Sequence, residues 1–255
     1  MKSLKQINIP AILSFIAVTI FFEVSVRLHW IPEFLFPAPS SVLVTLSENK
    51  TDFIHAFLET LEGSLVGLFF SIVLGTSVAI LFSLSPFLKK AILPFAIFFQ
   101  TVPIIAVAPL LVIYFGFGMP TVIAASFIVS LFPMIANTLL GLESVEKGKL
   151  ELFQLYKATR WQALIKLKLP SAYVSMYAGL KVSIGLAIIG AIAGEFVAGG
   201  GLGSMIDSAR TQQRIDIVFG ALILLSIMGL CCINCLKFVH ILLQRIRPYG
   251  LHLKD

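Results

Sequence analysis

Charged residues are scarce in this 255-residue sequence, and the shortage decides which class of protein it encodes. Only 13% of the residues are Asp, Glu, Lys or Arg, whereas 58% are hydrophobic and the mean hydropathy is +0.98. Soluble domains carry about 25% charged residues, so these few charges cannot cover an exterior that faces water. We therefore expect lipid around the chain, which excludes a cytosolic enzyme, a disordered chain and a nucleic-acid binder.

The sequence is also poor in residues that build disulfide, metal and catalytic sites. Its three cysteines, Cys231, Cys232 and Cys235, lie in one apolar run without a neighbouring histidine or acid. They predict neither a disulfide framework nor metal ligands. The four histidines have no ligand partner at a suitable spacing, and no nucleophile-elbow or metalloprotease motif is present. A membrane-embedded enzyme is disfavoured.

Long apolar runs are abundant and predict an all-α polytopic membrane protein, because a spanning helix needs about 20 mainly apolar residues. One of the runs contains Pro94, Pro103 and Pro109, and proline removes an amide donor and crowds the preceding turn. That run is expected to be kinked or partly unwound. The six expected spans are Ile9–Val26, Leu61–Leu84, Ala91–Phe115, Met119–Leu142, Tyr173–Ala198 and Ile217–Leu243.

The distribution of lysine and arginine predicts the orientation. With the N-terminus inside, 15 of the 19 basic residues fall on the inner side, and the outer side keeps only Arg27, Lys50, Arg210 and Arg214. Basic residues concentrate in cytoplasmic loops, so both termini are predicted to face the cytoplasm. We divide the chain into a first span with its outer connection (1–57), a core domain (58–247) that contains an inner loop at 143–172, and a cytoplasmic tail (248–255).

Small residues predict where helices pack closely. Gly63, Gly67, Ser71 and Gly75 recur every four residues along the second span. Such stripes let helix backbones approach one another in lipid, where the hydrophobic drive between helices is weak. We interpret the stripe as a surface for packing between helices of the same chain, in preference to a specific dimer interface.

The inner loop has the highest charge density in the chain. Its charges alternate with apolar and aromatic residues, which are Leu152, Phe153, Tyr156, Trp161, Leu164 and Ile165. This pattern predicts one or two short amphipathic helices, with Pro170 marking the return to the membrane. The apolar face fits either a groove on a partner protein or the surface of anionic lipid.

The order of residues in this loop resembles a family pattern. It reads Glu151-Leu-Phe-Gln-Leu-Tyr-Lys157-Ala-Thr-Arg160-Trp161-Gln162 and then Leu167-Lys-Leu169-Pro170. This resembles the loop of binding-protein-dependent ABC importer permeases, in which Glu-Ala-Ala is followed at fixed spacings by Gly, an aliphatic residue and Leu-Pro.

Further fragments are similar to the nitrate, sulfonate and taurine branch of that family, which includes permeases for thiamine pyrimidine precursors and riboflavin. These fragments are Phe36-Pro-Ala-Pro-Ser40, Gln100-Thr-Val-Pro103, Ala108-Pro109-Leu-Leu, Gly194-Glu195 and Gly201-Leu-Gly203.

The loop departs from the family pattern at two places. Leu152-Phe153 replace the paired alanines, and Lys157 replaces the glycine. A residue other than glycine costs about 1–2 kcal/mol in a left-handed conformation. The turn is therefore expected to be helical or displaced.

The resemblance implies a type I importer permease fold and a non-catalytic membrane subunit in the bacterial inner membrane. A coupling helix over Ala158–Ile165 would dock in a groove of a separate ATPase, with Trp161 as an anchor, Arg160 pairing with an acid and Glu151 bracing the loop. The implied coupling residues are Glu151, Lys157, Ala158, Arg160, Trp161, Leu164, Leu169 and Pro170.

ATP chemistry is expected on another chain, and no cofactor on this one. Gly148-Lys149 is followed by Leu150 and has Glu143 where a phosphate-binding loop needs its first glycine. The implied partners are two ATP-binding cassette ATPase subunits, an extracytoplasmic solute-binding protein and membrane lipid, with no nucleic acid. Two ATP sites imply two loops, so a second permease copy is expected, most simply a homodimer.

Polar and irregular residues of the third to fifth spans are candidates for the translocation pathway, namely Gln100, Thr101, Pro103, Pro109, Asn137 and Glu195. Hydrogen bonding between helices is an equally good interpretation for Gln100 and Asn137. For Glu195, bracing the glycine loop at Gly199–Gly203 is favoured over substrate binding.

The Gln-Thr-Val-Pro stretch favours a vitamin-type heterocycle as substrate, either a thiamine pyrimidine precursor or riboflavin, over a sulfonate, taurine or nitrate. The alternative function is an ion-coupled secondary transporter. Such a protein would have broken helices in paired positions, and only the third span looks broken.

Overall fold

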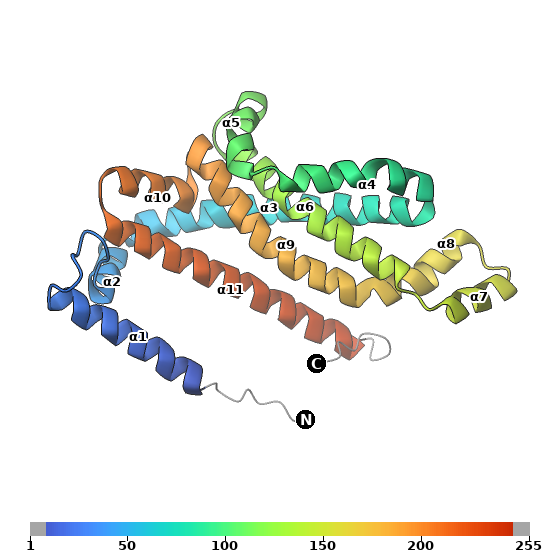
Figure 1. The fold of residues 1–255 in the computed structure, drawn as a ribbon, viewed down its shortest axis with the longest axis horizontal. Coiled ribbons are helices and arrows are strands. Elements are labelled where there is room, and N and C mark those ends of the chain that lie inside the picture. The colour runs from blue at the N-terminus through green and yellow to red at the C-terminus, as the bar shows by residue number, and fades with distance from the viewer. Residues whose placement is uncertain (1–8, 247–255) are drawn as a thin grey trace.

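The protein is described here by a computed structural model that covers residues 9–246, apart from the side chains of residues 11, 99, 245 and 246. Every regular element in this range is helical (Figure 1). The elements are α1 (Ile9–Arg27), α2 (Pro39–Glu48), α3 (Lys50–Leu84), α4 (Pro86–Thr101), α5 (Ile104–Phe115), α6 (Met119–Glu143), α7 (Lys147–Leu155), α8 (Arg160–Ala163), the π-helical turn η1 (Leu164–Lys168), α9 (Leu169–Ala198), α10 (Gly201–Thr211) and α11 (Ile215–Ile246).

Four helical segments in the described range are long and apolar enough to cross a membrane: α3, α6, the continuous α8–α9 segment and α11. They contain four of the six expected spans. The helix α1, with 19 residues, matches the first expected span in position, and its crossing of the membrane stays a prediction. The expected tail at 248–255 and the inner-side residues Lys2, Lys5, Arg247 and Lys254 lie outside the described residues.

The third expected span is divided into α4 and α5, as its prolines predicted. The helix stops at Thr101, Val102 and Pro103 are not helical, and α5 begins at Ile104. Proline disfavours the helical conformation of the residue before it, which explains a break at this dipeptide. Pro94 and Pro109 lie inside α4 and α5, so Pro103 alone marks the break.

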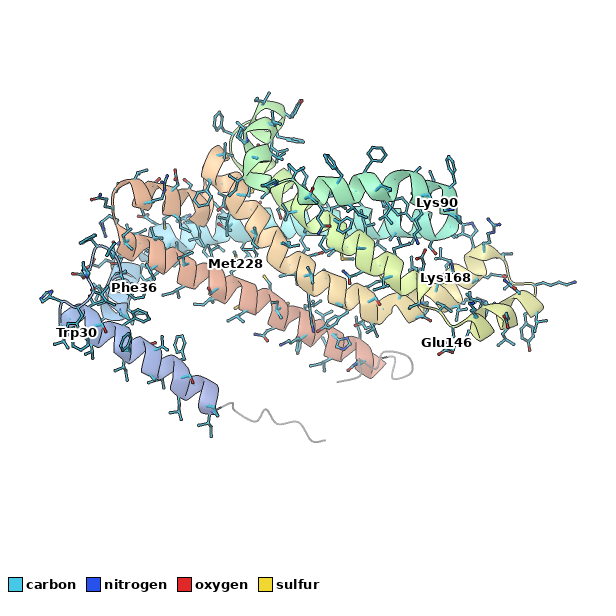
Figure 2. All side chains as sticks on the ribbon, viewed as in Figure 1. Trp30, Phe36, Lys90, Glu146, Lys168 and Met228 are labelled. Atoms are coloured by element: carbon cyan, nitrogen blue, oxygen red, sulfur yellow. The ribbon has the colours of Figure 1, made fainter. Side chains whose placement is uncertain are left out.

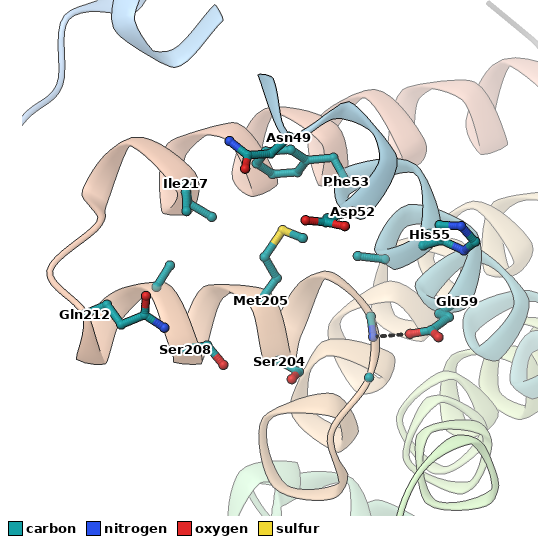
Figure 3. Close-up of a pocket in the computed structure, with 14 residues that line it drawn as sticks. Asn49, Asp52, Phe53, His55, Glu59, Ser204, Met205, Ser208, Gln212 and Ile217 are labelled. Carbon is teal, nitrogen blue, oxygen red and sulfur yellow. Dashed lines mark hydrogen bonds between the residues drawn. The ribbon is translucent and has the colours of Figure 1, made fainter. Parts of the chain in front are cut away.

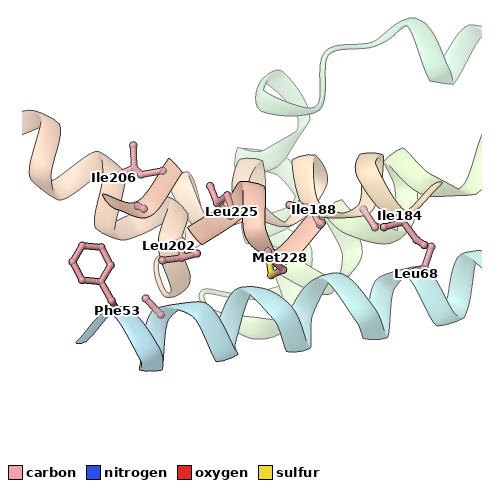
Figure 4. Close-up of a cluster of buried hydrophobic side chains, with 11 residues drawn as sticks. Phe53, Leu68, Ile184, Ile188, Leu202, Ile206, Leu225 and Met228 are labelled. Atoms are coloured by element: carbon pink, nitrogen blue, oxygen red, sulfur yellow. The ribbon is translucent and has the colours of Figure 1, made fainter. Parts of the chain in front are cut away.

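Small residues bring α3, α6 and α9 into close contact. A Cβ atom on Gly67 would lie 2.6 Å from Ser126 Cβ, and one on Gly75 would lie 2.8 Å from Met134 Cβ. The glycine stripe on α3 therefore packs against α6 of the same chain, which confirms packing within the chain. The buried cluster in Figure 4 adds apolar contacts of α3 with α9, α10 and α11, including those of Phe53, Leu202 and Met228.

The two ends of the bundle differ in chemistry. Figure 2 shows Lys90, Glu146 and Lys168 at one end and Trp30 and Phe36 at the other. The aromatic end joins α1 to the bundle, because the ring of Phe36 stacks on Phe22 at 4.2 Å and lies 4.7 Å from Phe219 of α11. The charged end is built from the inner loop.

The contact between α6 and α9 provides a stability test with a control on the same helix. A Cβ on Gly190 would lie 2.7 Å from Ala125 O and 2.8 Å from Ser126 Cα, and these backbone atoms cannot rotate away. We expect Gly190→Ala to lower the free energy of unfolding by about 1–3 kcal/mol through overpacking. Thermal unfolding of the purified protein in detergent measures the change.

Gly185 is the control, because a Cβ there would meet no atom within 4 Å. Gly185→Ala should leave stability unchanged or raise it by about 0.5–1 kcal/mol, since alanine favours a helix over glycine. Equal losses from both substitutions would contradict the packing argument.

Candidate functional site

The inner loop forms a structured platform at the charged end of the bundle. Leu164 anchors it, because this side chain is only 1% exposed and packs in a buried cluster with Phe82, Leu142 and Ala172. Polar contacts add to this anchor. Lys89 Nζ donates to both carboxylate oxygens of Glu143 at 2.7 Å, and Lys168 Nζ donates to Ser83 Oγ at 3.1 Å. The loop is thus tied to α3 and α4 as well as to its own helices.

The coupling helix differs from the one expected over Ala158–Ile165. Ala158 precedes the helix, which starts at Arg160 and runs without interruption through α8, η1 and α9 to Ala198. Pro170 lies in the first turn of α9 and therefore inside this continuous helix. The expectation of a separate helix that ends before Pro170 was therefore wrong.

The π-helical turn allows this continuity. Pro170 cannot donate to the carbonyl of Lys166, so the regular α-helical ladder loses a hydrogen bond there. In η1 the amide of Leu169 instead donates to Leu164 O, five residues back. Single π-helical turns inside α-helices are often found at functional sites, and this one joins the loop directly to a membrane helix.

Lys157 turns the chain with φ = 50°, in the left-handed region. Its amide donates to Gln154 O at 2.8 Å, and the next amide, of Ala158, donates to Phe153 O at 3.0 Å. Two such bonds around a left-handed residue define a Schellman motif, which ends a helix and usually carries glycine at this position. The turn is neither helical nor displaced, so the expectation drawn from the lysine was wrong.

Thr159 and Gln162 start α8 through a capping box that was missed in the sequence. Thr159 Oγ1 accepts the Gln162 amide at 3.2 Å, and Gln162 Oε1 accepts the Thr159 amide at 2.8 Å. The signal was present as Thr-x-x-Gln, the spacing of a helix start. Lys157 and Thr159 together fix the direction of the chain between α7 and α8.

The platform exposes apolar side chains to its surroundings. Leu155 and Tyr156 are each 80% exposed and Trp161 is 62% exposed, and the charged residues Glu151 and Arg160 are also exposed. Exposed aromatic and apolar side chains on an ordered surface mark interaction sites. The bracing role expected for Glu151 stays a prediction.

The predicted pathway residues do not form one cluster. Gln100 and Thr101 are exposed at the end of α4, Pro103 is exposed just before α5, and Pro109 is exposed within α5. Asn137 is half-buried on α6. Its side-chain amide donates to Pro133 O of the same helix at 2.9 Å, so this bond lies within α6 rather than between helices, the alternative to a pathway role.

Glu195 braces the start of α10, as favoured from the sequence. It is 1% exposed, and its Oε2 accepts the Gly203 amide at 2.7 Å. Two residues of α3 hold the preceding amides, because Glu59 Oε2 accepts that of Gly201 at 2.6 Å and Thr60 Oγ1 accepts that of Leu202 at 2.8 Å. Carboxylates are favourable at the positive end of a helix, so α10 is clamped to α3 and α9.

Metal chemistry has no framework in the described part of the chain, where no group of three or more His, Cys, Asp or Glu could hold an ion. The organised features are instead the platform, the helix break and the clamp on α10.

Comparison with known proteins identifies the family. The family described as "Binding-protein-dependent transport system inner membrane component" matches residues 71–248, which include the platform, the α4–α5 break and the clamp residue Glu195. The chain belongs to this family. It is an ABC importer permease, a multi-pass, non-catalytic membrane subunit of a transport complex.

Two relatives and one solved structure show the extent of the similarity. The formylaminopyrimidine transport permease ThiX of Halalkalibacterium halodurans is 32% identical over 88% of this chain and 90% of its own. The riboflavin transport permease RibX of Chloroflexus aurantiacus is 27% identical over 90% of this chain and 88% of its own. An inward-facing structure of the MetNI methionine ABC transporter matches with a TM-score of 0.63 at 18% identity, covering 73% of this permease and 92% of that chain.

The left-handed Lys157 generates a prediction about the platform. Lys157→Gly should stabilise the end of α7 by up to about 1 kcal/mol, because glycine removes a conformational cost of about 1–2 kcal/mol and loses part of the gain as chain entropy. Hydrogen exchange of the α7–α8 amides in the intact protein measures this. Lys149→Gly is the control: it places glycine inside α7, where glycine destabilises a helix, and should therefore accelerate exchange. Faster exchange in Lys157→Gly would contradict the left-handed turn assigned to Lys157.

Proposed function

We propose that this permease works with two ATP-binding cassette ATPase subunits and an extracytoplasmic solute-binding protein to import a small organic solute across the bacterial inner membrane. The observation that carries the proposal is the platform. It presents Leu155, Tyr156 and Trp161 outward while Leu164 and η1 join it to the membrane helices. The exposed apolar side chains suit binding to a partner protein, and the rigid connection to α9 would pass that partner's movement on to the membrane helices.

A second copy of the permease completes the pathway in this proposal. Within one chain Gln100 and Thr101 stand exposed among apolar side chains at the α4–α5 break, including those of Phe95 and Ile105. Irregular backbone at membrane depth is tolerated where it is covered by protein or lines a water-filled cavity. In a homodimer, the α4–α5 breaks of the two copies could face each other across one water-filled pathway. The irregular backbone would then be covered by protein or line that cavity, as it must at membrane depth.

The proposed substrate is an uncharged or weakly charged heterocycle, either a thiamine pyrimidine precursor or riboflavin. Residues 91–115 contain no charged side chain, so this part of α4 and α5, around the break, offers hydrogen bonds and apolar contact but no cation for a sulfonate or nitrate. The named solutes of ThiX and RibX are of the same chemical class.

Transport by the reconstituted complex tests this function. The permease, its ATPase and its solute-binding protein in proteoliposomes should take up formylaminopyrimidine or riboflavin with internal ATP, and taurine at background rate. Uptake driven by a proton or sodium gradient without the ATPase would replace the proposal by the ion-coupled alternative. ATP-driven uptake of taurine alone would retain the importer and reject the heterocycle.

Trp161 is expected to dominate the ATPase contact, as buried aromatic anchors do at interfaces. Trp161→Ala should weaken ATPase binding by roughly 2 kcal/mol, about 30-fold in Kd, with membrane insertion unchanged. Binding of the purified ATPase to the permease in nanodiscs measures the effect.

Trp30 is the control, because it is 72% exposed and belongs to the end opposite the platform (Figure 2). Trp30→Ala should leave ATPase binding unchanged. Wild-type affinity in Trp161→Ala would contradict the docking role of the platform.

A further inference from the structure

A pocket of about 380 Å³ lies between the first turns of α3 and the length of α10, with Ile217 of α11 at one end (Figure 3). Its apolar wall includes Phe53 and Met205. Its polar residues are Asn49, Asp52, His55, Glu59, Ser204, Ser208 and Gln212. It is separate from both the platform and the α4–α5 break.

The pocket lies beyond the expected membrane span. The 35 residues of α3 extend about 52 Å at 1.5 Å per residue, whereas the hydrocarbon core is about 30 Å thick. The span expected in α3 begins at Leu61, so the segment from Asn49 to Glu59 projects into water. In the predicted orientation this is the outer side.

The pocket has carboxylates in its lining but no Lys or Arg. The carboxylates belong to Asp52 and Glu59, which lie two helical turns apart on the same face of α3. One oxygen of Glu59 holds the Gly201 amide (Figure 3). Asp52 has no hydrogen-bond or ion-pair partner in the described part of the chain. Carboxylates above an apolar wall suit the aliphatic stem and cationic end of Lys or Arg.

The charges around the pocket reinforce this preference. Three of the four outer-side cations are already paired, namely Arg27 with Glu23, Arg210 with Asp207 and Arg214 with Asp216. The outer side has only these and Lys50 against eight acids besides the buried Glu195 of the clamp, namely Glu23, Glu33, Glu48, Asp52, Glu59, Glu62, Asp207 and Asp216. A surface with this excess steers a positively charged partner toward itself.

A divalent cation fits the pocket less well than a protein side chain. Calcium takes six to eight oxygen ligands, whereas the described residues here form no cluster of three metal-binding side chains. The open outer position instead suits a large partner that docks over α3 and α10 and inserts one side chain.

We propose that the pocket between α3 and α10 receives a Lys or Arg side chain of the solute-binding protein when that protein docks. This inference rests on the proposed function, which supplies the partner. The docked cation would lie beside Glu59, which also holds the start of α10. The docked side chain would therefore contact the start of α10, which hydrogen bonds from α3 and α9 hold in place.

Affinity of the assembled importer for its solute-binding protein tests the inference. The probe is the solute-binding protein of the proposed importer, and the importer is the permease–ATPase complex in nanodiscs. Asp52→Asn combined with Glu59→Gln should weaken binding about tenfold or more and flatten its salt dependence, since paired charges are screened by salt. The glutamine can still accept the Gly201 amide. The control Glu48→Gln removes an outer charge outside the pocket and should leave affinity unchanged.

A steric variant gives an independent readout. Ser208→Trp fills the pocket without changing its charge and should also weaken docking. Each Lys and Arg of the solute-binding protein can also be changed to Glu in turn. At one position this change should abolish binding to the wild-type permease, and Asp52→Lys in the permease should restore it.

Three results would overturn the inference: wild-type affinity in both pocket variants, equal loss in Glu48→Gln, or docking that disappears with EDTA and returns with calcium. In each of these the wild-type complex still binds its solute-binding protein, so the proposed function stands. Failure of the wild-type complex to bind that protein would remove the proposed function together with the inference.

Discussion

Close contact between α6 and α9 is the constraint on which the rest of the structure depends. Helices in lipid gain little from hydrophobic association, so they are held by dense packing and hydrogen bonds. Gly190 lies against the backbone of Ala125 and Ser126, and Gly179 lies against Asn137. Ser183 Oγ adds a bond to Ser130 O at 2.9 Å. These contacts fix α9, whose two ends carry the platform and the clamp on α10.

Irregular backbone occurs where this rigid core meets its functional parts. Gln100 and Thr101 are exposed at the end of α4, beside the break at Pro103; η1 joins the platform to α9, and Lys157 sets the direction between α7 and α8. Each irregularity has local hydrogen bonds or a proline that explains it. The core fixes the positions of these segments, and the proposed function assigns the contacts with partners and solute to them.

Much of this arrangement could be predicted from the sequence, because it follows from composition and spacing. The apolar runs located the membrane helices, the proline cluster indicated the broken span, and the glycine spacing indicated close packing. The turn at Lys157 was missed because two backbone hydrogen bonds offset a conformational cost of about 1–2 kcal/mol that residue type alone suggests. The continuity of α8 with α9 was missed because a π-helical turn has no sequence signature comparable to a capping box. Residues such as Gln100 are exposed in the single chain, so the contacts within the chain do not define their role.

The helix from Arg160 to Ala198 has a mechanical consequence. Its 39 residues are helical throughout, but the chain changes direction at η1, between α8 and α9 (Figure 1). Beyond that turn α9 is held against α6 at several levels, including Gly179, Ser183 and Gly190. A force applied at Trp161 therefore reaches Glu195 and the start of α10 only by carrying α6 and α9 together, so the pair acts as one stiff strut between the two surfaces of the membrane.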